Sequence, residues 1–463
     1  MAAGKEQKAR IEIFDQGLFA DRSIYIDRII HMHYPKEKDG REVNRFIAFV
    51  LTILFFLNFF FSKAIAQEVI SWQDCVKEAA KNHPDLISSQ EAVKQSQAGK
   101  KITASSLFPQ VDSNLNASTS KTAGVTKDSY SYGVTGTQLI FDGNKTVNNV
   151  KAAAENIKVA KLNYKFTSSE VRFRLRAAFI NLLKAQEELN LTHQIYDIRR
   201  SNLELITLRY QSGMEHKGAL LLAEANLEEA SFAITQAKRG LEVAQRDLIK
   251  EMGRKQLSPI SVNGDFVVKN PEKEKPDFDA IVENNPSLKS LIAKINQSNF
   301  SLRAAYDNFY PQLSAQAGTG RTAAQWPPET NQWNAGLALT FPIFEGGLRF
   351  AQVSQAEAIL NQAKANERSG RDVLVLVLEQ TWATLQDSVD TVSVQQKFLE
   401  AAEERTKIAE AQYSTGFITY DNWIIIEDSL VSTKRNFLDA QANALIAKAN
   451  WIQAKGETLE YED

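Results

Sequence analysis

The sequence predicts a mainly helical fold with a small antiparallel β part, built from one structural unit that occurs twice. Lys145–Ser212 contains neither proline nor glycine, the two strongest helix breakers. Apolar or aromatic residues recur in this stretch every seven positions, as in a coiled-coil seam. The same landmarks return about 203 residues later in the chain. Together these observations predict two long helical hairpins, each preceded by a pair of strands.

The first long helix is predicted over Asn144–Gln211, ending in a turn at Tyr210–Gly213. At about 1.5 Å per residue, such a helix is a rod of roughly 100 Å. Its seam residues are Leu175, Leu182, Leu189, Tyr196, Leu203 and Tyr210. At the equivalent positions of the second half stand Leu378, Leu385, Val392, Leu399, Thr406 and Tyr413, which keep the heptad phase with one polar exception.

Other landmarks support an internal duplication. The segment Asn82–Leu86 returns as Asn284–Leu288, and Ile140–Gly143 returns as Ile343–Gly346. The first pair of segments is separated by 202 residues and the second pair by 203. Because these separations differ by only one residue, each half is predicted to be one structural unit used twice.

The N-terminal region carries an export signal. Phe46–Phe61 is an almost unbroken apolar run, preceded by Arg45 and followed by an A-x-A cleavage motif that ends at Ala66. A transmembrane anchor is the alternative, but it needs about 20 apolar residues. The mixed-charge residues 1–45 are interpreted as a leader that results from a start site assigned too early.

The predicted organisation follows from these boundaries. Residues 1–66 form the signal peptide with its leader, 67–253 the first repeat, 254–283 an inter-repeat segment, 284–456 the second repeat and 457–463 a C-terminal tail. Within the repeats, β-hairpins are expected at about 110–141 and 312–343, and helical hairpins at about 144–253 and 345–456.

The mature chain begins with a short helix over Trp72–Lys81 and a second helix over Pro84–Ser106, since proline fits the first helical turn. The period then changes to two, which predicts strands over Val111–Ser120 and Tyr130–Phe141, joined by a polar loop around residues 122–128. The only cysteine, Cys75, is expected to be a small buried residue.

The four predicted strands are typical of a transmembrane β-barrel in length and alternation; a soluble sheet is the alternative. Aromatic residues stand near the strand ends, where an aromatic girdle would lie: Phe108, Phe141, Tyr310, Trp326 and Phe344. Four strands in a bilayer would leave two unpaired edges, and the smallest closed barrels have about eight strands. Partner chains are therefore required, and three chains would give twelve strands.

A returning helix of about 35 residues is predicted to end at Gly253. It can match only part of the long helix, so Pro84–Ser106 is expected to stack end to end on it. Between the repeats, the segment around Asn263-Gly264 carries a hairpin signal, and it is expected to pack outside the helical body with the charged run Lys269–Lys275 on its surface.

Four motifs occur twice in the same order: the Asn-x-Pro-x-Leu helix starts at Pro84 and Pro286, the Pro-Gln pairs at Pro109 and Pro311, the Phe-(Asp/Glu)-Gly strand exits, and the Tyr-x-x-Gly turns at Tyr210 and Tyr413. In these motifs, over about Ile70–Gly456, the chain resembles the TolC-like outer membrane efflux proteins. The resemblance implies a homotrimer in outer membrane lipid, with a twelve-stranded β-barrel continued by a twelve-helix α-barrel. It also implies a periplasmic adaptor and an inner-membrane transporter of the ABC or RND type as partners.

By this resemblance, the helical turns form the periplasmic tip and dock the adaptor. The residues implied are Tyr210, Gly213, Tyr413, Gly416 and Thr419, although they could equally serve only to end the helices. A ring of acids would close the tip, and Asp421, Glu427 and Asp428 are the candidates. Asp421 departs from the family spacing by one residue, so solvated surface acids are the preferred alternative for this group.

Other classes of function fit less well. The mature chain has three histidines, His83, His193 and His216, far apart in sequence, and it lacks metal, nucleophile-elbow and phosphate-loop motifs. No enzyme activity and no cofactor are therefore expected. The near-neutral net charge of -2 argues against nucleic acid as a partner.

A periplasmic coiled-coil adaptor or scaffold is the alternative function, but it would normally carry one hairpin and no paired strands. The predicted function is a passive exit duct for efflux or secretion, and the sequence leaves its cargo open.

Overall fold

The computed structural model describes residues 68–255, 258–266 and 274–460. The expected signal peptide and leader, residues 1–66, lie outside the described residues. The first half contains β1 (Glu68–Ile70), α4 (Trp72–Asn82), α5 (Pro84–Ser105), β2 (Gln110–Thr122), β3 (Val125–Phe141), α6 (Lys145–Gln211) and α7 (Lys217–Glu251). After β4 (Ile260–Val262), the second half contains α8 (Phe278–Asn284), α9 (Pro286–Asp307), β5 (Gln312–Ala323), β6 (Thr330–Thr340), α10 (Leu348–Ser414) and α11 (Tyr420–Ala454).

The two halves repeat one another in element order and in helix length. The long helices α6 and α10 have 67 residues each, and the returning helices α7 and α11 have 35 each. The predicted duplication of long helical hairpins is therefore confirmed. None of the described helices is both long enough and apolar enough to span a bilayer.

Local sequence sets the helix ends. Helices α5 and α9 each begin with a proline, after a residue whose side chain caps the first turn. His83 Nδ1 accepts a hydrogen bond from the amide of Asp85, and Asn285 Oδ1 accepts one from the amide of Ser287. Each hairpin turns at a glycine in the left-handed region, Gly213 with φ 75° and Gly416 with φ 80°.

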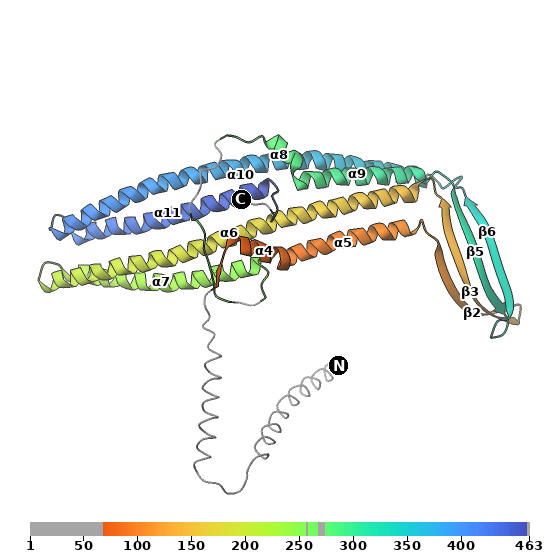
Figure 1. Ribbon diagram of the computed structural model, residues 1–463, viewed down its shortest axis with the longest axis horizontal. Helices are drawn as coiled ribbons and strands as arrows, with labels where there is room; N and C mark the ends of the chain where they lie inside the picture. The colour runs from red at the N-terminus through yellow and green to blue at the C-terminus, as the bar shows by residue number, and fades with distance from the viewer. Residues whose placement is uncertain (1–67, 256–257, 267–273, 461–463) are drawn as a thin grey trace, which may run out of the picture. The chain divides into compact units, whose positions relative to one another are not determined.

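Helices α5 and α7 lie end to end along α6, and α9 and α11 lie in the same way along α10 (Figure 1). The predicted stacking is confirmed. At the first junction Gly253 has φ 74°, and a Cβ built there would lie 2.5 Å from the carbonyl oxygen of Asn82. Glycine is therefore needed here both for the backbone conformation and for the close approach of the end of α7 to the link between α4 and α5.

The helices form four rows in the order α5/α7, α6, α9/α11, α10. The rows α5/α7 and α10 each pack chiefly against one neighbouring row in the described chain. The body therefore has two open helical edges, one from each half.

The strands form one antiparallel sheet in the order β2-β3-β5-β6. β2 and β3 are longer than predicted, with 13 and 17 residues. The predicted loop at 122–128 is wrong, because Ala123 and Gly124, at φ 50° and 81°, make a two-residue turn that lets pairing continue to Thr122 and Val125. Within this sheet β2 and β6 each pair with one strand only.

The inter-repeat segment differs from its prediction. Asn263-Gly264 makes no hairpin with the described residues, because β4 pairs in parallel with β1, from the other end of the repeat. Ile260 is fully buried, and a Cβ at Gly264 would lie 3.2 Å from the Phe179 ring. This part of the segment thus belongs to the core rather than to the outside of the body. Most of the charged run Lys269–Lys275 lies outside the described residues.

The largest hydrophobic cluster lies where α4, α6, α7 and β4 meet, and Cys75 belongs to it. As predicted, Cys75 is buried, and burial raises the pKa of its thiol to about 12. The thiol is therefore neutral at physiological pH and acts as a small apolar core residue.

Candidate functional site

The register of the sheet separates apolar from polar side chains. Residues directly opposite one another in an antiparallel pair share a face, so the pairing across all four strands assigns every position. The apolar face includes Val111, Leu115, Tyr130, Tyr132, Val134, Ala315, Ala317, Trp333, Ala335, Leu337 and Leu339. The polar face includes Asp112, Asn114, Asn116, Ser118, Ser131, Thr135, Thr137, Ser314, Gln316, Thr322, Gln332 and Asn334.

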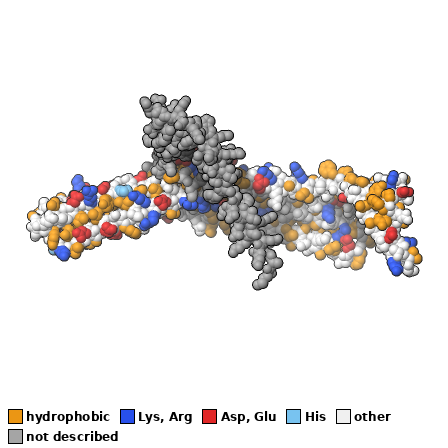
Figure 2. Space-filling view, turned by 90° about the horizontal axis from the view of Figure 1, so that it is seen from below, with side chains coloured by type: hydrophobic (Ala, Val, Ile, Leu, Met, Phe, Trp, Pro, Cys, Tyr) orange, Lys and Arg blue, Asp and Glu red, His pale blue; other side chains and the backbone are white. Residues whose placement is uncertain are grey.

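The apolar face is exposed in the single chain. Trp333 is 81% exposed, and Leu337 and Leu339 are comparably open. Figure 2 shows hydrophobic side chains gathered at the end of the molecule that carries the strands. A sheet with an exposed apolar face and an exposed polar face fits a wall between lipid and water.

The aromatic residues predicted at the strand ends lie at two different ends of the sheet. Trp326, in the loop between β5 and β6, packs edge-on against Tyr130 and Tyr132, with ring centroids 6.3 and 6.5 Å apart. Phe108, Phe141, Tyr310 and Phe344 lie at the other end, next to the helices. We call the end with Trp326 the loop end.

The turns of the two helical hairpins meet in an aromatic cluster. Tyr413 stacks on Trp423 at 4.6 Å, and Tyr420 packs edge-on against both rings. The Arg209 guanidinium lies 4.7 Å from the centre of the Tyr413 ring. Tyr413 Oη donates a hydrogen bond of 2.9 Å to Glu215 Oε1, which joins the second hairpin to the first. Burial, followed by the Glu215 carboxylate, raises the pKa of Tyr413 well above its usual value.

The residues expected to dock an adaptor therefore differ in their exposure to solvent. Tyr413 is only 1% exposed, so its side chain is not presented to a partner, in contrast to the expectation. Tyr210, Gly213 and Gly416 are exposed. Thr419 accepts a hydrogen bond from the amide of Asn422 and so caps α11.

The three candidate gate acids also differ in their exposure to solvent. Asp421 is exposed in the first turn of α11. Glu427 is only 4% exposed, so its interpretation as a surface acid is wrong. The physical reason is that α11 packs against α6, which belongs to the other repeat.

Helix α6 supplies the polar partners of Glu427. Arg199 Nη1 donates to Glu427 Oε2 at 2.5 Å, and Asn202 Nδ2 donates to Oε2 of the same carboxylate at 2.6 Å. Arg199 also pairs with Asp428, whose side chain is 58% exposed. Burial raises the pKa of Glu427 above its ordinary value, although Asn202 and Arg199 act in the opposite direction.

Sequence reasoning missed Arg199 and Asn202 as members of this site. One signal could have found Arg199: its equivalent 203 residues later is Ala402, so this charge occurs in only one of the two repeats. By contrast, Glu427 has an acidic equivalent, Glu224, which is exposed.

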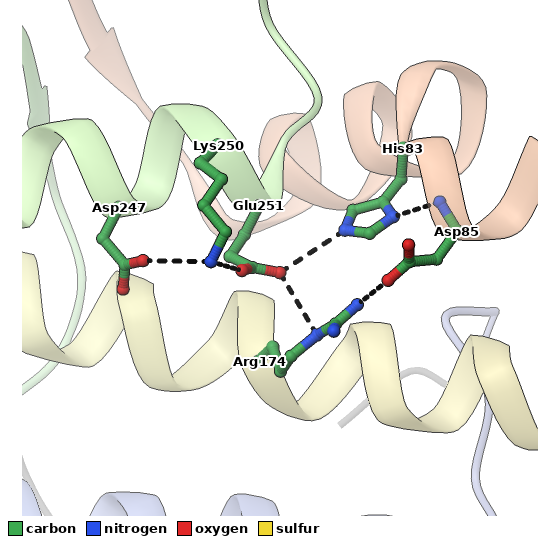
Figure 3. A network of polar contacts seen from close by, with 6 residues as sticks. All are labelled: His83, Asp85, Arg174, Asp247, Lys250 and Glu251. Atoms are coloured by element: carbon green, nitrogen blue, oxygen red, sulfur yellow. Dashed lines mark hydrogen bonds and ion pairs between the residues drawn. The ribbon is translucent and has the colours of Figure 1, made fainter.

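A second polar network lies where α5 meets α7 (Figure 3). Glu251 is buried at its centre and lies 3.4 Å from His83 Nε2, 3.4 Å from Arg174 Nε and 2.6 Å from Lys250 Nζ. Arg174 also pairs with Asp85, and Lys250 with Asp247. The network links α5, α6 and α7 through charge.

At the equivalent positions of the second repeat, neutral residues replace this network. There Asn285 stands for His83, Val377 for Arg174 and Ala454 for Glu251, and Asn285 Nδ2 donates to the carbonyl oxygen of Ala454 at 3.0 Å. The ionic network is therefore a structural link of the first repeat. Among the described residues, no group of three or more histidine, cysteine or acidic side chains is placed to hold a metal ion.

The open helical edges carry a second heptad pattern. On α7, one exposed stripe consists of Leu222, Ala225, Glu229, Phe232, Gln236, Arg239, Val243, Arg246 and Lys250. On α10, the face turned away from α11 presents Leu376, Gln380, Ala383, Asp387, Asp390, Val394, Lys397, Ala401, Glu404, Ile408 and Ala411, all exposed. We call these the α7 edge stripe and the α10 edge stripe. Both follow the alternating three- and four-residue spacing of a coiled-coil seam.

The two stripes carry opposite charge at the same level of the helical body. Residues 240–247 of α7 lie beside residues 181–188 of α6, and together they line a shallow hollow. The equivalents of 181–188 in α10 are residues 384–391, which include Asp387 and Asp390. On the α7 edge stripe, Arg239 lies directly before residues 240–247 and Arg246 lies within them. Both basic residues are therefore near the level of Asp387 and Asp390.

Comparisons with known proteins agree with this architecture. A family model described as outer membrane efflux protein matches residues 75–254 and 278–457. The outer membrane efflux protein BepC of Brucella suis biovar 1 (strain 1330) is 21% identical over 336 residues, which cover 70% of this chain and 72% of BepC.

Solved structures share the fold. A crystal structure of CusC matches with a TM-score of 0.74 at 19% identity, over 84% of this chain and 93% of that chain. The outer membrane channel CmeC of Campylobacter jejuni matches with a TM-score of 0.72 at 19% identity, over 84% of this chain and 86% of that chain. The predicted fold class is confirmed, and because the family model covers both repeats, the chain belongs to the outer membrane efflux protein family.

Proposed function

We propose that this protein is the exit duct of a tripartite efflux or secretion system. It conducts substrate passively from an inner-membrane transporter and a periplasmic adaptor, across the periplasm and the outer membrane. One observation carries the proposal: four paired strands separate an apolar from a polar face and leave both edges of the sheet open. In a bilayer such edges need partners, since hydrocarbon offers no water to satisfy them.

The assembly that satisfies both the sheet and the helices is a homotrimer. β6 of one chain would pair with β2 of the next, which closes a barrel of twelve strands. The same rotation brings the α10 edge stripe against the α7 edge stripe of the next chain. Exposed apolar side chains on both stripes, such as Phe232 and Val394, and opposite charges at one level support this contact.

The polar face would line the pore with amide and hydroxyl groups. Two strand residues on that face are charged: Asp112, near the helical end of β2, and Lys127, in the part of β3 beyond its pairing with β5. The relatives are named as efflux proteins and channels rather than as enzymes. The driving energy therefore comes from the partner transporter, of the ABC or RND type, and not from this chain.

The tip of the helical hairpins is the proposed docking end for the adaptor. Phe417 is 83% exposed and Met214 is 67% exposed, beside the turns at Gly416 and Gly213. Exposed apolar side chains at a hairpin turn offer contact area to a partner helix. Asp421 and Asp428 remain candidates for the acidic ring of the gate, while Glu427 would act by holding Arg199.

A pair of neighbouring residues provides the test. Gln316 and Ala317 follow one another in β5, both are exposed, and the register points Gln316 to the polar face and Ala317 to the apolar face. The mature protein carrying Gln316→Cys or Ala317→Cys would be purified as a trimer from the outer membrane and recorded in a planar bilayer. A charged, water-soluble thiol reagent should lower the conductance of the Gln316→Cys channel and leave the Ala317→Cys channel unchanged.

Two results would contradict the proposal. A protein that stays a soluble monomer without conductance would point to an adaptor or scaffold instead. Equal modification of both channels would show that the polar face does not line the pore. Because Cys75 is buried, the background reaction of the native thiol is expected to be small.

A further inference from the structure

The apolar face of the sheet contains one charge that the proposed barrel does not explain. Three strand residues on this face are charged: Lys121, Asp128 and Arg321. Lys121 and Asp128 lie in the part of the β2–β3 hairpin that projects beyond the β3–β5 pairing, which begins at Tyr130 and Ala323. Arg321 is therefore the one charged side chain on the apolar face where all four strands are paired.

Arg321 is held in position by its neighbours. Its pairing partners are Tyr132 in β3 and Asn331 in β6. Its Nε donates a hydrogen bond of 3.0 Å to Asn331 Oδ1, which fixes the plane of the guanidinium group. No carboxylate in the described part of the chain forms an ion pair with it, so its two Nη groups remain available to another acceptor.

The depth of Arg321 matches a membrane boundary. The strand runs from Leu313, at the helical end, to Arg321 over eight residues, which at about 3.3 Å per residue is about 26 Å. A barrel strand tilts by about 35–45°, so the height is about 20 Å, close to the roughly 25 Å of the apolar band of a barrel. The aromatic side chains of Tyr130, Tyr132, Trp326 and Trp333 gather at the same level.

We propose that Arg321 binds the phosphate of a lipid headgroup at the outer boundary of the apolar band. The inference rests on the proposed function, because it requires the apolar face to contact lipid. An arginine facing hydrocarbon is strongly unfavourable at the bilayer midplane, but it costs little at the interface. Its planar guanidinium offers two parallel donors, the geometry that a phosphate group accepts.

A lipid fits this surface better than free phosphate does. The surface around Arg321 is formed by aromatic rings, by Leu115 in register with Arg321 and, deeper on the same face, by Val134 and Leu337. Acyl chains would cover these apolar side chains, whereas a free anion would leave them in water. The ligand we assign is therefore a phosphate-bearing lipid, with its headgroup on Arg321 and its chains along the apolar face.

The test compares lipids with and without an exposed phosphate. The intact trimer would be placed in phosphatidylcholine nanodiscs with either phosphatidic acid or the uncharged diacylglycerol, and bound lipid would be counted by native mass spectrometry. Wild type should retain phosphatidic acid over diacylglycerol. Arg321→Gln should weaken that retention about tenfold, since it removes a charge-assisted hydrogen-bonded pair. Arg321→Lys, which keeps the charge without the fork, should fall between the two.

Lys127→Gln is the matched control, because Lys127 also lies at the loop end of the sheet but on the opposite face of the strands. It should retain phosphatidic acid as the wild type does. Unchanged retention in Arg321→Gln would overturn the proposal. Displacement of phosphatidic acid by inorganic phosphate would also overturn it, because the site would then bind the free anion.

The same preparation distinguishes the absence of the lipid site from the absence of a duct. Channel conductance of each trimer is measured in parallel. A conducting trimer that retains no phosphatidic acid contradicts only the lipid site. A protein that neither conducts nor forms trimers contradicts the duct, and with it the inference.

Discussion

Among the individual residues, the buried carboxylate of Glu427 shows that the environment of a side chain depends on a segment far away in the sequence. Glu427 lies between α11 and α6, and its charge is compensated by Arg199 and Asn202. Removing an ion from water is costly, and its compensation requires well-placed partners. Here burial outweighs the partners, since it raises the pKa of Glu427 above its ordinary value of 4.5.

This shift gives a pH prediction with a definite sign. Well above the raised pKa, Glu427 is ionised in both the folded and the unfolded state, and the folded state bears the part of the burial cost that Arg199 and Asn202 do not offset. As the pH falls through the raised value toward 4.5, the folded state takes up a proton that the unfolded state does not. The contribution of Glu427 to stability therefore becomes more favourable.

Glu427→Gln cannot take up this proton. The stability of the wild type relative to the variant should thus rise as the pH falls from neutral to 4.5. Thermal midpoints of both proteins in the same detergent at several pH values measure the difference. A difference that stays constant with pH would show that Glu427 does not titrate in this way.

At the scale of elements, the end-to-end junctions let two short helices match one long helix. Each junction needs a chain reversal in a small space, which the left-handed glycines Gly253 and Gly456 allow. In the first repeat the ionic network around Glu251 adds a charged link between three helices. In the second repeat, the corresponding contact is a neutral hydrogen bond from Asn285 to the carbonyl oxygen of Ala454.

Gly253→Ala should loosen the first junction. The new Cβ would lie 2.5 Å from the carbonyl oxygen of Asn82, at a φ of 74° that alanine rarely adopts, so the end of α7 would have to move away from the link between α4 and α5. We expect a loss of at least about 1 kcal/mol, larger than the usual strain of such a backbone angle alone. Hydrogen exchange of the Asn82–Asp85 amides, together with the thermal midpoint, would detect the change.

Gly99→Ala is the control for this prediction. Gly99 lies inside α5, and a Cβ there would have no atom within 4 Å, so alanine should stabilise by about 0.5–1 kcal/mol. If both variants behaved alike, the junction would not depend on the close approach at Gly253.

At the scale of the whole molecule, the single chain leaves complementary edges on its two sides. The α7 edge stripe and the α10 edge stripe each continue a heptad pattern outward, and β2 and β6 each keep an unpaired side. Each helical hairpin buries one face within the chain and leaves the edge stripe exposed. Such an arrangement is suited to closing a ring of identical chains.

Charge reversal tests which residues meet across that ring. Asp387→Lys should weaken the trimer by placing like charges opposite Arg239 and Arg246, and Arg246→Glu should do the same from the other side. The double variant restores opposite charges, so the two effects should not add, with a coupling of about 0.5–3 kcal/mol. Analytical ultracentrifugation in detergent measures the trimer fraction.

Arg200→Glu is the control, because Arg200 lies on α6, which is enclosed by two rows of helices in the chain. It should leave the trimer fraction near that of the wild type. Additive effects in the double variant would instead show that Asp387 and Arg246 do not face one another.

Much of the fold follows from the sequence, because it depends on neighbours along the chain. The absence of proline and glycine determined the length of α6, the prolines at 84 and 286 determined where α5 and α9 begin, and the period of two determined the strands. The polar and apolar faces of the sheet follow from the same alternation.

The candidate site depended on contacts that local patterns do not encode. Only the tertiary structure showed that Tyr413 is buried against Trp423, that Glu427 meets Arg199 across the two repeats, and that β4 pairs with β1. In each case the partners are far apart in sequence, and the packing of whole helices decides which side of a residue becomes buried. Local sequence patterns thus specify the helices and strands and their repetition, whereas the packing between the repeats specifies which charges and aromatic rings meet. Burial depends on the surfaces that pack together and not on one helix.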